Sequence, residues 1–352
     1  MTRLVVETVG PATSVQDGGR FGAQRYGLPP SGAMDRTALA AANCLVGNEP
    51  LSAAIEIGPL GAAFTARGGV VRVALAGALR HADTGSGPLA MLATMLLADG
   101  ESLRLGVARE GVFSYLAIAG GIPGEPTFGS LSVNQRAGLG SPYPRPLQPG
   151  DVIDVMDAAP WPSERLLHLP ALPRDETIRV VMGPQDDEFD NAESALCAPE
   201  WRVSIVSDRM GYRLDGPTIQ HRHGHNIVSD GTVTGSIQVP GNGQPIVLMP
   251  DRGTTGGYPK IATVISADLG RLAQMQPGRA FRFRAVSMEE AQTEARRAAM
   301  RIADLPERVR EAGPSQLDLA ALQEVNIAGD VVSAFDTAIS QAPTSVPDKE
   351  AP

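Results

Sequence analysis

The chain has 352 residues, of which 43% are apolar, so it is long enough for two or three domains with buried cores. Its formal charge of −9 and its pI of about 5.1 argue against nucleic acid and anionic membranes as partners, because both bind basic surfaces. Its two cysteines form no CxxC pair, and the sequence has neither a signal-peptide pattern nor a long apolar span, so we expect a cytoplasmic protein with no membrane contact.

Short strand-like runs alternate with glycine and proline turns from residue 2 to about residue 157. One helix interrupts these runs: Asp35 is a suitable N-cap for it, and Gly47 is a suitable residue to follow its end. The pattern predicts a first, mainly β domain over residues 1–160. Its strand-like runs are RLVVETV (3–9), VVRVALAG (70–77), SLRLGVA (102–108), VFSYLAIAGG (112–121) and DVIDVM (151–156).

The second half of the chain repeats this organisation. A proline-rich stretch over 158–175 is typical of a linker. After it come the strand-like run IRVVM, a short helix near Asp186, and further runs up to RAFRFRAV. Both halves end in a Q-P-G turn that leads into an alternating strand, in LQPGDVIDV and in MQPGRAFRFRAV. The sequence therefore predicts a second, similar all-β domain over residues 175–286.

A helical segment follows the second domain. The sequence SMEE, which begins at Ser287, is a capping box, and it predicts an Arg- and Ala-rich helix that ends at about Leu305. We expect a C-terminal helical segment over 287–340 and a disordered tail over 341–352.

The loop PDRGTTGGYPK, residues 250–260, is the most polar connection in the second half. Only 2 of the 30 basic residues are lysines, Lys260 and Lys349, so the folded part of the chain contains a single lysine. A lysine carries a compact charge that the planar guanidinium of arginine does not reproduce, which favours a site at Lys260. The alternative is a surface lysine that extends its charge into water. The adjacent hydroxyls and glycines could cradle an anion.

Two further segments combine acids, arginines and tyrosines. They are SVQDGGRFGAQRYGLPPSGAMDR (14–36) and SDRMGYRLDGP (207–217). An acid beside an arginine can form a bidentate pair that only shapes a loop. The functional interpretation is an arginine fork for a carboxylate or phosphate, next to an acid that transfers protons.

These segments, together with SIQVPGNGQPIVLMPDRGTTGGYPKIATV and YLAIAGGI, resemble the allophanate hydrolase subunit 2, or KipA, family of biotin-dependent carboxyltransferase-like proteins. The C subunit of bacterial 5-oxoprolinase belongs to this family. The resemblance covers roughly residues 3–335. It implies a mainly β fold of two cyclophilin-like β-barrel units with a few short helices and a C-terminal helix. It also implies a KipI-type (allophanate hydrolase subunit 1-type) partner and a site where barrels of the two subunits meet.

The resemblance implies several activities. We expect one subunit of a cytosolic, ATP-dependent 5-oxoprolinase that converts 5-oxo-L-proline to L-glutamate, with KipI-type and LamB/YcsF-type partners and with ATP and Mg in the complex. One alternative is the carboxyltransferase component of a biotin-dependent urea or amide carboxylase. Another is a non-catalytic regulator that binds a KipI-like protein. The chain contains no biotin-attachment MKM and no glycine-rich ATP-grasp region, so biotin or ATP chemistry would need partner chains.

Residue type and loop position suggest a role for each candidate. Lys260, Arg20 and Arg209 would hold a carboxylate or a phosphorylated intermediate, and the acids would transfer protons. The candidates for catalysis are Asp17, Asp208, Asp251 and Lys260. The candidates for substrate binding are Gln16, Arg20, Arg25, Ser31, Asp35, Arg136, Arg209, Tyr212, Arg213, Gln238, Thr254, Thr255 and Tyr258.

Two segments call for separate expectations. GSLSVNQRAGLG, residues 129–140, lacks an arginine that the family pattern has after Gly129, although Arg136 remains. His221, His223 and His225 alternate, so on a strand they would face one side as zinc ligands can. No carboxylate or fourth ligand lies at a suitable spacing, so we expect no metal site.

Overall fold

The computed structural model describes residues 2–156, 163–169 and 176–312, and strands dominate this part of the chain. The prediction of a mainly β fold with few helices is confirmed. Within the described ranges, no helix is long and apolar enough to span a membrane.

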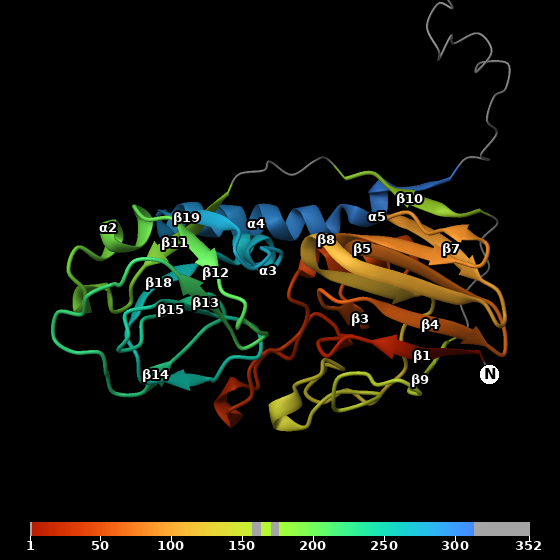
Figure 1. Cartoon of the computed structure of the whole chain (residues 1–352), viewed down its shortest axis with the longest axis horizontal. Helices are drawn as coiled ribbons and strands as arrows, with labels where there is room; N and C mark the ends of the chain where they lie inside the picture. Colours follow the sequence, from red (N-terminus) through yellow and green to blue (C-terminus); the bar gives the residue numbers. More distant parts are fainter. Residues whose placement is uncertain (1, 157–162, 170–175, 313–352) are drawn as a thin grey trace, which may run out of the picture. The chain divides into compact units, whose positions relative to one another are not determined.

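An eleven-stranded sheet is formed by the first half of the chain together with strand β20 from near the end of the described residues (Figure 1). Its longest strands, β5 and β8, pair antiparallel from Val73–Ile118 to Asp83–Arg104, and each also pairs with other strands. The sheet contains β1 (Arg3–Val9), β2 (Ser14–Gln16), β3 (Ala54–Ile57), β4 (Ala62–Arg67), β5 (Val71–Thr84), β6 (Gly87–Pro88), β7 (Ala93–Leu97), β8 (Ser102–Ile118), β9 (Val152–Asp154), β10 (Arg165–Leu167) and β20 (Val309–Glu311).

Helix α1 (Arg36–Leu45) lies against β5 and β8. The Asp35 carboxylate accepts hydrogen bonds from the backbone N–H groups of Thr37 and Ala38, both at 3.1 Å, as an N-cap does. Gly47, just beyond the end of the helix, has a φ of 73°, which glycine adopts without strain. Both predicted helix ends are confirmed.

The second half of the chain forms a closed seven-stranded barrel. Its strands, in order around the barrel, are β11 (Thr177–Met182), β18 (Lys260–Val264), β15 (Ser236–Gln238), β16 (Ile246–Leu248), β13 (Gly211–Asp215), β12 (Trp201–Val203) and β19 (Ala280–Ala285). The other elements here are the strand pair β14 (Asp230–Gly231) and β17 (Thr255–Gly256), the helices α2 (Ala192–Cys197) and α3 (Leu269–Ala273), and the 3-10 turns η3 (Asp186–Glu188) and η4 (Ser266–Asp268). Two further 3-10 turns, η1 (Gln24–Tyr26) and η2 (Gln135–Ala137), belong to loops of the first half.

The two Q-P-G turns have the same local structure. Asp151 N–H donates to the Gln148 carbonyl at 3.1 Å, and Arg279 N–H donates to the Gln276 carbonyl at 3.1 Å. Their strands then pair differently, because β9 runs antiparallel to β1 whereas β19 runs parallel to β11. The repeated Q-P-G motif therefore predicted the two turns correctly, but it did not predict how the strands after them pair.

The C-terminal helix α4 (Met288–Ala303) begins as the capping box predicted, since the Ser287 hydroxyl accepts a hydrogen bond from the Glu290 N–H at 3.1 Å. Helix α5 (Leu305–Arg308) follows, and the chain then returns to the sheet as β20. The rest of the predicted helical segment and the predicted disordered tail lie outside the described residues.

The linker prediction is wrong for residues 163–169, because this part contains strand β10, which pairs with β7 and β20. Leu167 is buried there against the rest of the core. The prolines that suggested a linker lie on either side of β10. The strands that pair with β10 are too distant in sequence for a local pattern to indicate them.

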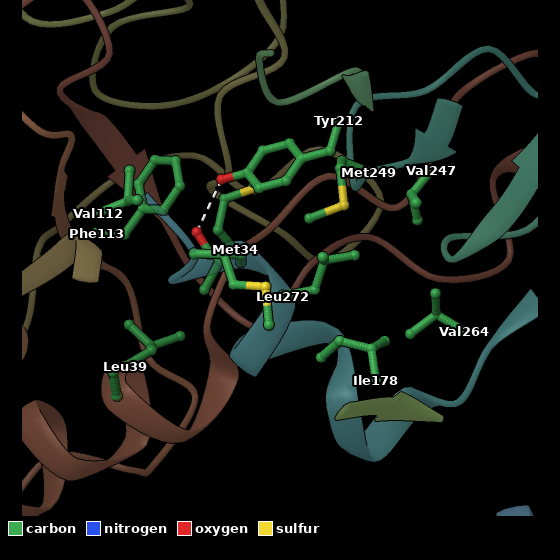
Figure 2. Packing of buried hydrophobic residues seen from close by; sticks show 14 of the residues in the cluster. Met34, Leu39, Val112, Phe113, Ile178, Tyr212, Val247, Met249, Val264 and Leu272 are labelled. Carbon is green, nitrogen blue, oxygen red and sulfur yellow. Dashed lines mark hydrogen bonds between the residues drawn. The ribbon is translucent and has the colours of Figure 1, made fainter. Parts of the chain in front are cut away.

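One hydrophobic cluster includes side chains from both halves (Figure 2). Met34 and Phe113 come from the first half, while Tyr212 and Leu272 come from the second. A second cluster lies entirely in the first half, around residues such as Leu4 and Phe64. The larger core is therefore shared, and it holds the loops of the two halves in fixed positions.

Candidate functional site

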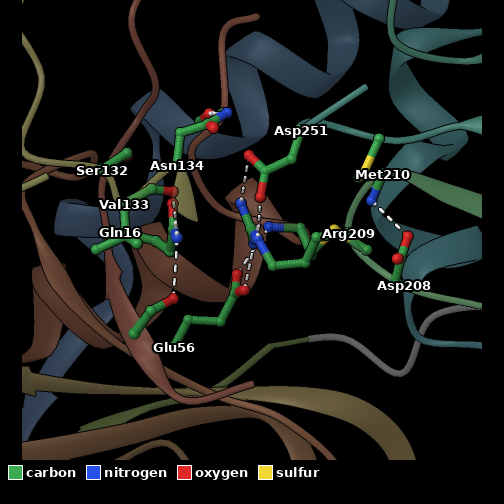
Figure 3. Close-up of polar contacts among 12 residues, drawn as sticks. Gln16, Glu56, Ser132, Val133, Asn134, Asp208, Arg209, Met210 and Asp251 are labelled. Atoms are coloured by element: carbon green, nitrogen blue, oxygen red, sulfur yellow. Dashed lines mark hydrogen bonds and ion pairs between the residues drawn. The ribbon is translucent and has the colours of Figure 1, made fainter. Parts of the chain in front are cut away.

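Polar residues from several distant segments meet between the sheet and the barrel. Figure 3 shows the Arg209 guanidinium between the carboxylates of Asp251 and Glu56. Its Nε lies 2.8 Å from Asp251 Oδ2, and its Nη1 lies 2.5 Å from Glu56 Oε1. Its Nη2 donates to the Gly32 carbonyl at 2.7 Å. We call this region the junction.

Charge pairing and burial oppose each other at the junction. Burial raises the pKa of Glu56, and the Arg209 charge opposes this effect only in part. Burial by itself lowers the pKa of Arg209, but the carboxylates of Asp251 and Glu56 outweigh burial and raise the pKa above its usual value. Glu56 is fully buried in β3, where it also accepts hydrogen bonds from the Tyr115 hydroxyl at 2.7 Å and the Met34 N–H at 2.8 Å. Sequence analysis missed Glu56, because a single acid inside an apolar strand has no local motif.

Asp17 organises the loop on the sheet side of the junction. Its carboxylate accepts hydrogen bonds from the hydroxyls of Ser130 and Ser132 and from the backbone N–H groups of Gly19 and Leu131, at 2.5–2.7 Å. Four donors occupy most of its lone pairs, so Asp17 holds segments 17–19 and 130–132 together. The expectation that it transfers protons stays a prediction.

Neighbouring polar side chains complete the sheet side. The Asn134 amide donates to the Ser31 hydroxyl at 3.0 Å, and the Ser31 N–H donates to the Pro250 carbonyl at 3.1 Å, so the two halves are joined there. The Gln16 amide nitrogen donates to the Val133 carbonyl at 3.1 Å (Figure 3). Its oxygen is buried and has no hydrogen-bond partner among the described residues. Ser31 has a φ of 53°, a strained conformation for a residue other than glycine.

Two arginines near the junction are buried with unused donors. Arg20 is 1% exposed and Arg252 is 2% exposed. In each of them, Nε and Nη1 have no hydrogen-bond partner within the described part of the chain. Arg20 Nη2 donates to the Ser132 carbonyl, and burial lowers the pKa of Arg20 although Asp17 and Asp251 oppose the effect. Sequence analysis named Arg20 and passed over Arg252, although both lie in segments that it singled out.

The remaining candidates of segments 14–36 and 207–217 have other surroundings. Tyr212 is buried in the shared core, where its hydroxyl donates to the Ala273 carbonyl at 2.8 Å and burial raises its pKa. Asp208 accepts from the N–H groups of Met210 and Gly211 and shapes its own loop. Arg25 lies over the Tyr26 ring, and Arg213 is exposed. Asp35 caps α1, as described above.

Arg136 and the position in segment 129–140 where the family pattern has arginine have different surroundings. Arg136 Nη1 approaches the Met210 sulfur at 3.4 Å, so it reaches from the sheet side to the barrel side. Leu131 lines a cleft of about 660 Å³ with Asp17 and Gly129, and residues of helix α4 also line it. An apolar side chain therefore faces the cleft close to the position where the family pattern has arginine.

Lys260 lies away from the junction. Gln238 pairs with Lys260 at the end of the barrel where β16 begins. Gly211, two residues after Arg209, pairs with Leu248 where β16 ends. Loop 250–260 therefore runs from one end of these strands to the other, and it separates Lys260 from Arg209 and Asp251.

Lys260 is 3% exposed, so it is not the surface lysine of the alternative interpretation. Its Nζ lies 2.8 Å from the carboxylate of Asp230, which is 52% exposed. Gln185 bridges the pair: its oxygen accepts from the Lys260 N–H at 3.0 Å, and its nitrogen donates to Asp230 at 3.2 Å. Other candidates lie beside this pair. Gln238 donates to the Tyr258 carbonyl, Thr255 belongs to β17, and the Thr254 carbonyl accepts from Thr232.

Within the described residues, no group of three His, Cys, Asp or Glu side chains could hold a metal ion. His221 Nε2 lies 2.9 Å from the Val239 carbonyl, and its ring packs against Phe189 and His225. His221 and His225 are thus in ring contact with each other, whereas His223 is exposed.

Comparisons with known proteins agree on a family. Residues 26–285 match the family described as carboxyltransferase domain, subdomain A and B. The chain is 38% identical over 291 residues to the C subunit of 5-oxoprolinase from Escherichia coli (strain K12), covering 82% of this chain and 93% of that protein. It is 36% identical over 279 residues to the protein of the same name from Haemophilus influenzae, covering 79% and 89%.

A solved structure supports the same assignment. The crystal structure of the K. lactis urea amidolyase aligns with a TM-score of 0.79 and 27% identity, over 88% of this chain and 20% of that one. The region that matches the family, residues 26–285, includes the whole barrel together with Glu56 and Arg209 of the junction. The chain therefore belongs to the family of carboxyltransferase domains with subdomains A and B.

Proposed function

We propose that this chain is the C subunit of an ATP-dependent 5-oxoprolinase, which converts 5-oxo-L-proline to L-glutamate. The relatives with 36–38% identity carry this name, and they are covered over 89–93% of their length. One structural observation supports a substrate site in the chain itself. Gln16 lies beside Arg209 in the junction (Figure 3), and Arg20 of the same segment is close enough to Asp251 for that carboxylate to oppose the effect of burial on the pKa of Arg20. Arg20 keeps buried donors unused there, as a receptor for the substrate carboxylate would.

The proposed roles follow from these contacts. Arg20 binds the carboxylate of 5-oxo-L-proline, and Gln16 offers its unpaired oxygen to the lactam N–H. Arg209 fixes the orientation of the Asp251 carboxylate. ATP and Mg act in the assembled enzyme, and we assign no step that involves them to the described residues. The partners we propose are a KipI-type and a LamB/YcsF-type protein, in the cytoplasm.

The test is reconstitution from the three purified proteins. Glutamate release from 5-oxo-L-proline should require ATP and should stop when this chain is omitted. The variant Arg20→Met should raise KM at least tenfold, because it removes the carboxylate receptor. Arg202→Met is the matched control: Arg202 is a half-exposed arginine paired with Glu200 on the barrel, and its loss should leave the rate unchanged.

A second candidate function is the carboxyltransferase component of a biotin-dependent urea or amide carboxylase. The similarity to the urea amidolyase structure over 88% of this chain favours it. Activity with urea that depends on biotin, without activity on 5-oxo-L-proline, would support this candidate against the first. Full turnover without this chain would instead point to a non-catalytic regulator.

A further inference from the structure

The chain shows two different ways of burying an arginine. Arg80, 3% exposed, uses Nε, Nη1 and Nη2. These atoms donate to the Ser114 hydroxyl and to backbone carbonyls that include those of Leu60, Gly106 and Gly58. Because all its nitrogens are bonded, Arg80 is a structural arginine that fixes loops.

Arg252 is buried as deeply and bonded through one nitrogen only. Its Nη2 donates to the Gln24 side-chain oxygen and to the Thr232 carbonyl, both at 3.0 Å. Its Nε and Nη1 are buried and have no hydrogen-bond partner in the described part of the chain. An arginine has five N–H donors, so three of them remain unused.

Arg252 also lacks a countercharge. Arg209 and Arg179, two half-buried arginines of the barrel side, each contact two carboxylates. No carboxylate of the described residues lies within 4.0 Å of Arg252. Burial lowers the pKa of Arg252, and no neighbouring acid opposes the effect. A guanidinium stays charged in proteins, so its burial without a countercharge is unfavourable, and a bound anion would offset this cost.

Exposed residues of the chain lie next to Arg252. Arg252 follows Asp251 of the junction and lies beneath a surface loop in which Gly253 and Thr255 are exposed. On the sheet side it is covered by Gln24, itself an exposed residue of η1. A ligand would reach the guanidinium from this side only after Gln24 moved, because Nε and Nη1 are themselves buried.

We propose that Arg252 is the receptor of a small oxyanion, a carboxylate or a phosphate, which accepts hydrogen bonds from Nε–H and Nη1–H. This site is additional to the Arg20 site of the proposed function. Binding can be measured on the isolated chain, so a failure of 5-oxoprolinase activity would leave the proposal intact. Equally, a failure of anion binding at Arg252 would leave the proposed 5-oxoprolinase function intact.

The experiment measures the melting temperature of the isolated chain in sodium phosphate, 5-oxo-L-proline or L-glutamate, each compared with sodium chloride at equal ionic strength. An oxyanion at about ten times its dissociation constant should raise the melting temperature by roughly 2–4 °C. Comparison of the three anions in the original chain and in Arg20→Met, which lacks the other proposed carboxylate receptor, tells a phosphate receptor from a carboxylate receptor at Arg252. Arg202→Met, which removes an exposed charge from the same barrel, should retain the full rise.

The variants separate a receptor from a structural arginine. Arg252→Met should abolish at least half of the anion-dependent rise. Without anion, it should melt within about 2 °C of the original chain, because it removes a charge that the protein does not compensate. Arg252→Lys keeps the charge and should bind the anion at least tenfold more weakly, because one ammonium cannot replace the separate Nε and Nη donors.

Three results would overturn the proposal. One is the absence of any rise with all three anions. Another is a full rise in Arg252→Met. The third is a fall of more than about 5 °C in Arg252→Met without anion, which would mean that Arg252 acts as Arg80 does.

Discussion

At the scale of single residues, Arg209 connects the two halves of the molecule most directly. It contacts Glu56 on a strand of the sheet and Asp251 in a loop of the barrel, and Glu56 is fully buried. Replacement of one member of such a group leaves the others charged and without a partner. Removal of Arg209 alone should therefore lower the free energy of unfolding strongly. Replacement of Arg209, Glu56 and Asp251 together should change it much less.

We expect Arg209→Met to lower the free energy of unfolding by about 3–5 kcal/mol, because Glu56 and Asp251 would lose their countercharge. Urea denaturation of the isolated chain measures this change. The double variant Arg209→Met with Glu56→Gln should recover part of the loss, because the buried carboxylate is then neutral. Equal stability of the single and double variants would contradict the charge argument.

Lys260 offers a second test at this scale. Lys260 is the first cause of the lowered pKa of Asp230, since its Nζ donates to that carboxylate. In Lys260→Met, the pKa of Asp230 should therefore rise towards its usual value of 3.8, which NMR titration of the carboxyl carbon would detect. Gln185→Ala is the control and should produce a smaller rise. An unchanged pKa in Lys260→Met would mean that the pair does not form in solution.

A residue with a specific contact could be predicted from the sequence where its residue type is rare in the chain. The single lysine of the folded part was noticed, and Lys260 is indeed engaged in a specific contact. Its partner Asp230 was missed, as was Glu56, because each contact joins residues that are 30 or 153 positions apart. No local pattern carries that information.

At the scale of elements, helix α4 is attached to the barrel through a short chain of ion pairs. Arg179 on β11 contacts Asp268 of η4 at 2.7 Å and Glu294 of α4 at 3.0 Å. Burial alone would raise the pKa of Asp268, but the hydrogen bonds from Arg179 outweigh burial and hold the pKa below its usual value of 3.8. Asp268 is fully buried, so this pair is shielded from water.

This pair should make the protein sensitive to acid. A carboxyl with a lowered folded-state pKa stabilises the fold above its unfolded pKa, and this contribution is lost as the pH falls through the folded value. Below pH 3.8, Asp268 should therefore add up to about 1.4 kcal/mol per pH unit to the loss of stability. Urea denaturation at pH 5, 4 and 3 should show a shallower dependence in Asp268→Asn. Parallel curves for the two proteins would exclude this role.

Elements with local signals were predicted well. Helix α1 and the start of α4 follow their capping residues, and both Q-P-G turns form, since each depends on contacts within a few positions. Strand β10 was assigned to a linker because its three residues have no pattern of their own and depend on β7 and β20 for pairing.

At the scale of the whole molecule, the shared hydrophobic cluster joins the sheet to the barrel. Two separate domains were predicted from the alternation of strands, and that pattern cannot indicate what the apolar face of α1 packs against. In the structure, Met34 and Leu39 lie in the same cluster as Ile178 and Leu272 (Figure 2). The polar contacts of Gln274 with Asp35 and Phe113 lie along the same boundary.

We therefore expect the sheet and the barrel to unfold together. Calorimetry of the isolated chain should show one transition, with a calorimetric enthalpy equal to the van't Hoff enthalpy. Fragments 1–160 and 175–286, expressed separately, should each lack a cooperative transition, because each would expose its part of the shared cluster. Two resolved transitions in the whole chain would favour the independent domains that the sequence predicted.

Strand β10, which was not predicted, also determines where the chain leaves the sheet and where it returns. β10 leads out of the sheet towards the barrel, and β20, where the chain returns, pairs with it so that Leu167 lies opposite Val309 (Figure 1). The barrel is thus topologically an insertion within the sheet, entered and left through neighbouring points. A tag or fusion partner joined just before β1 or just after β20 would be tethered to the sheet alone. A circular permutant opened inside the barrel would keep every strand of the sheet in its original order of pairing.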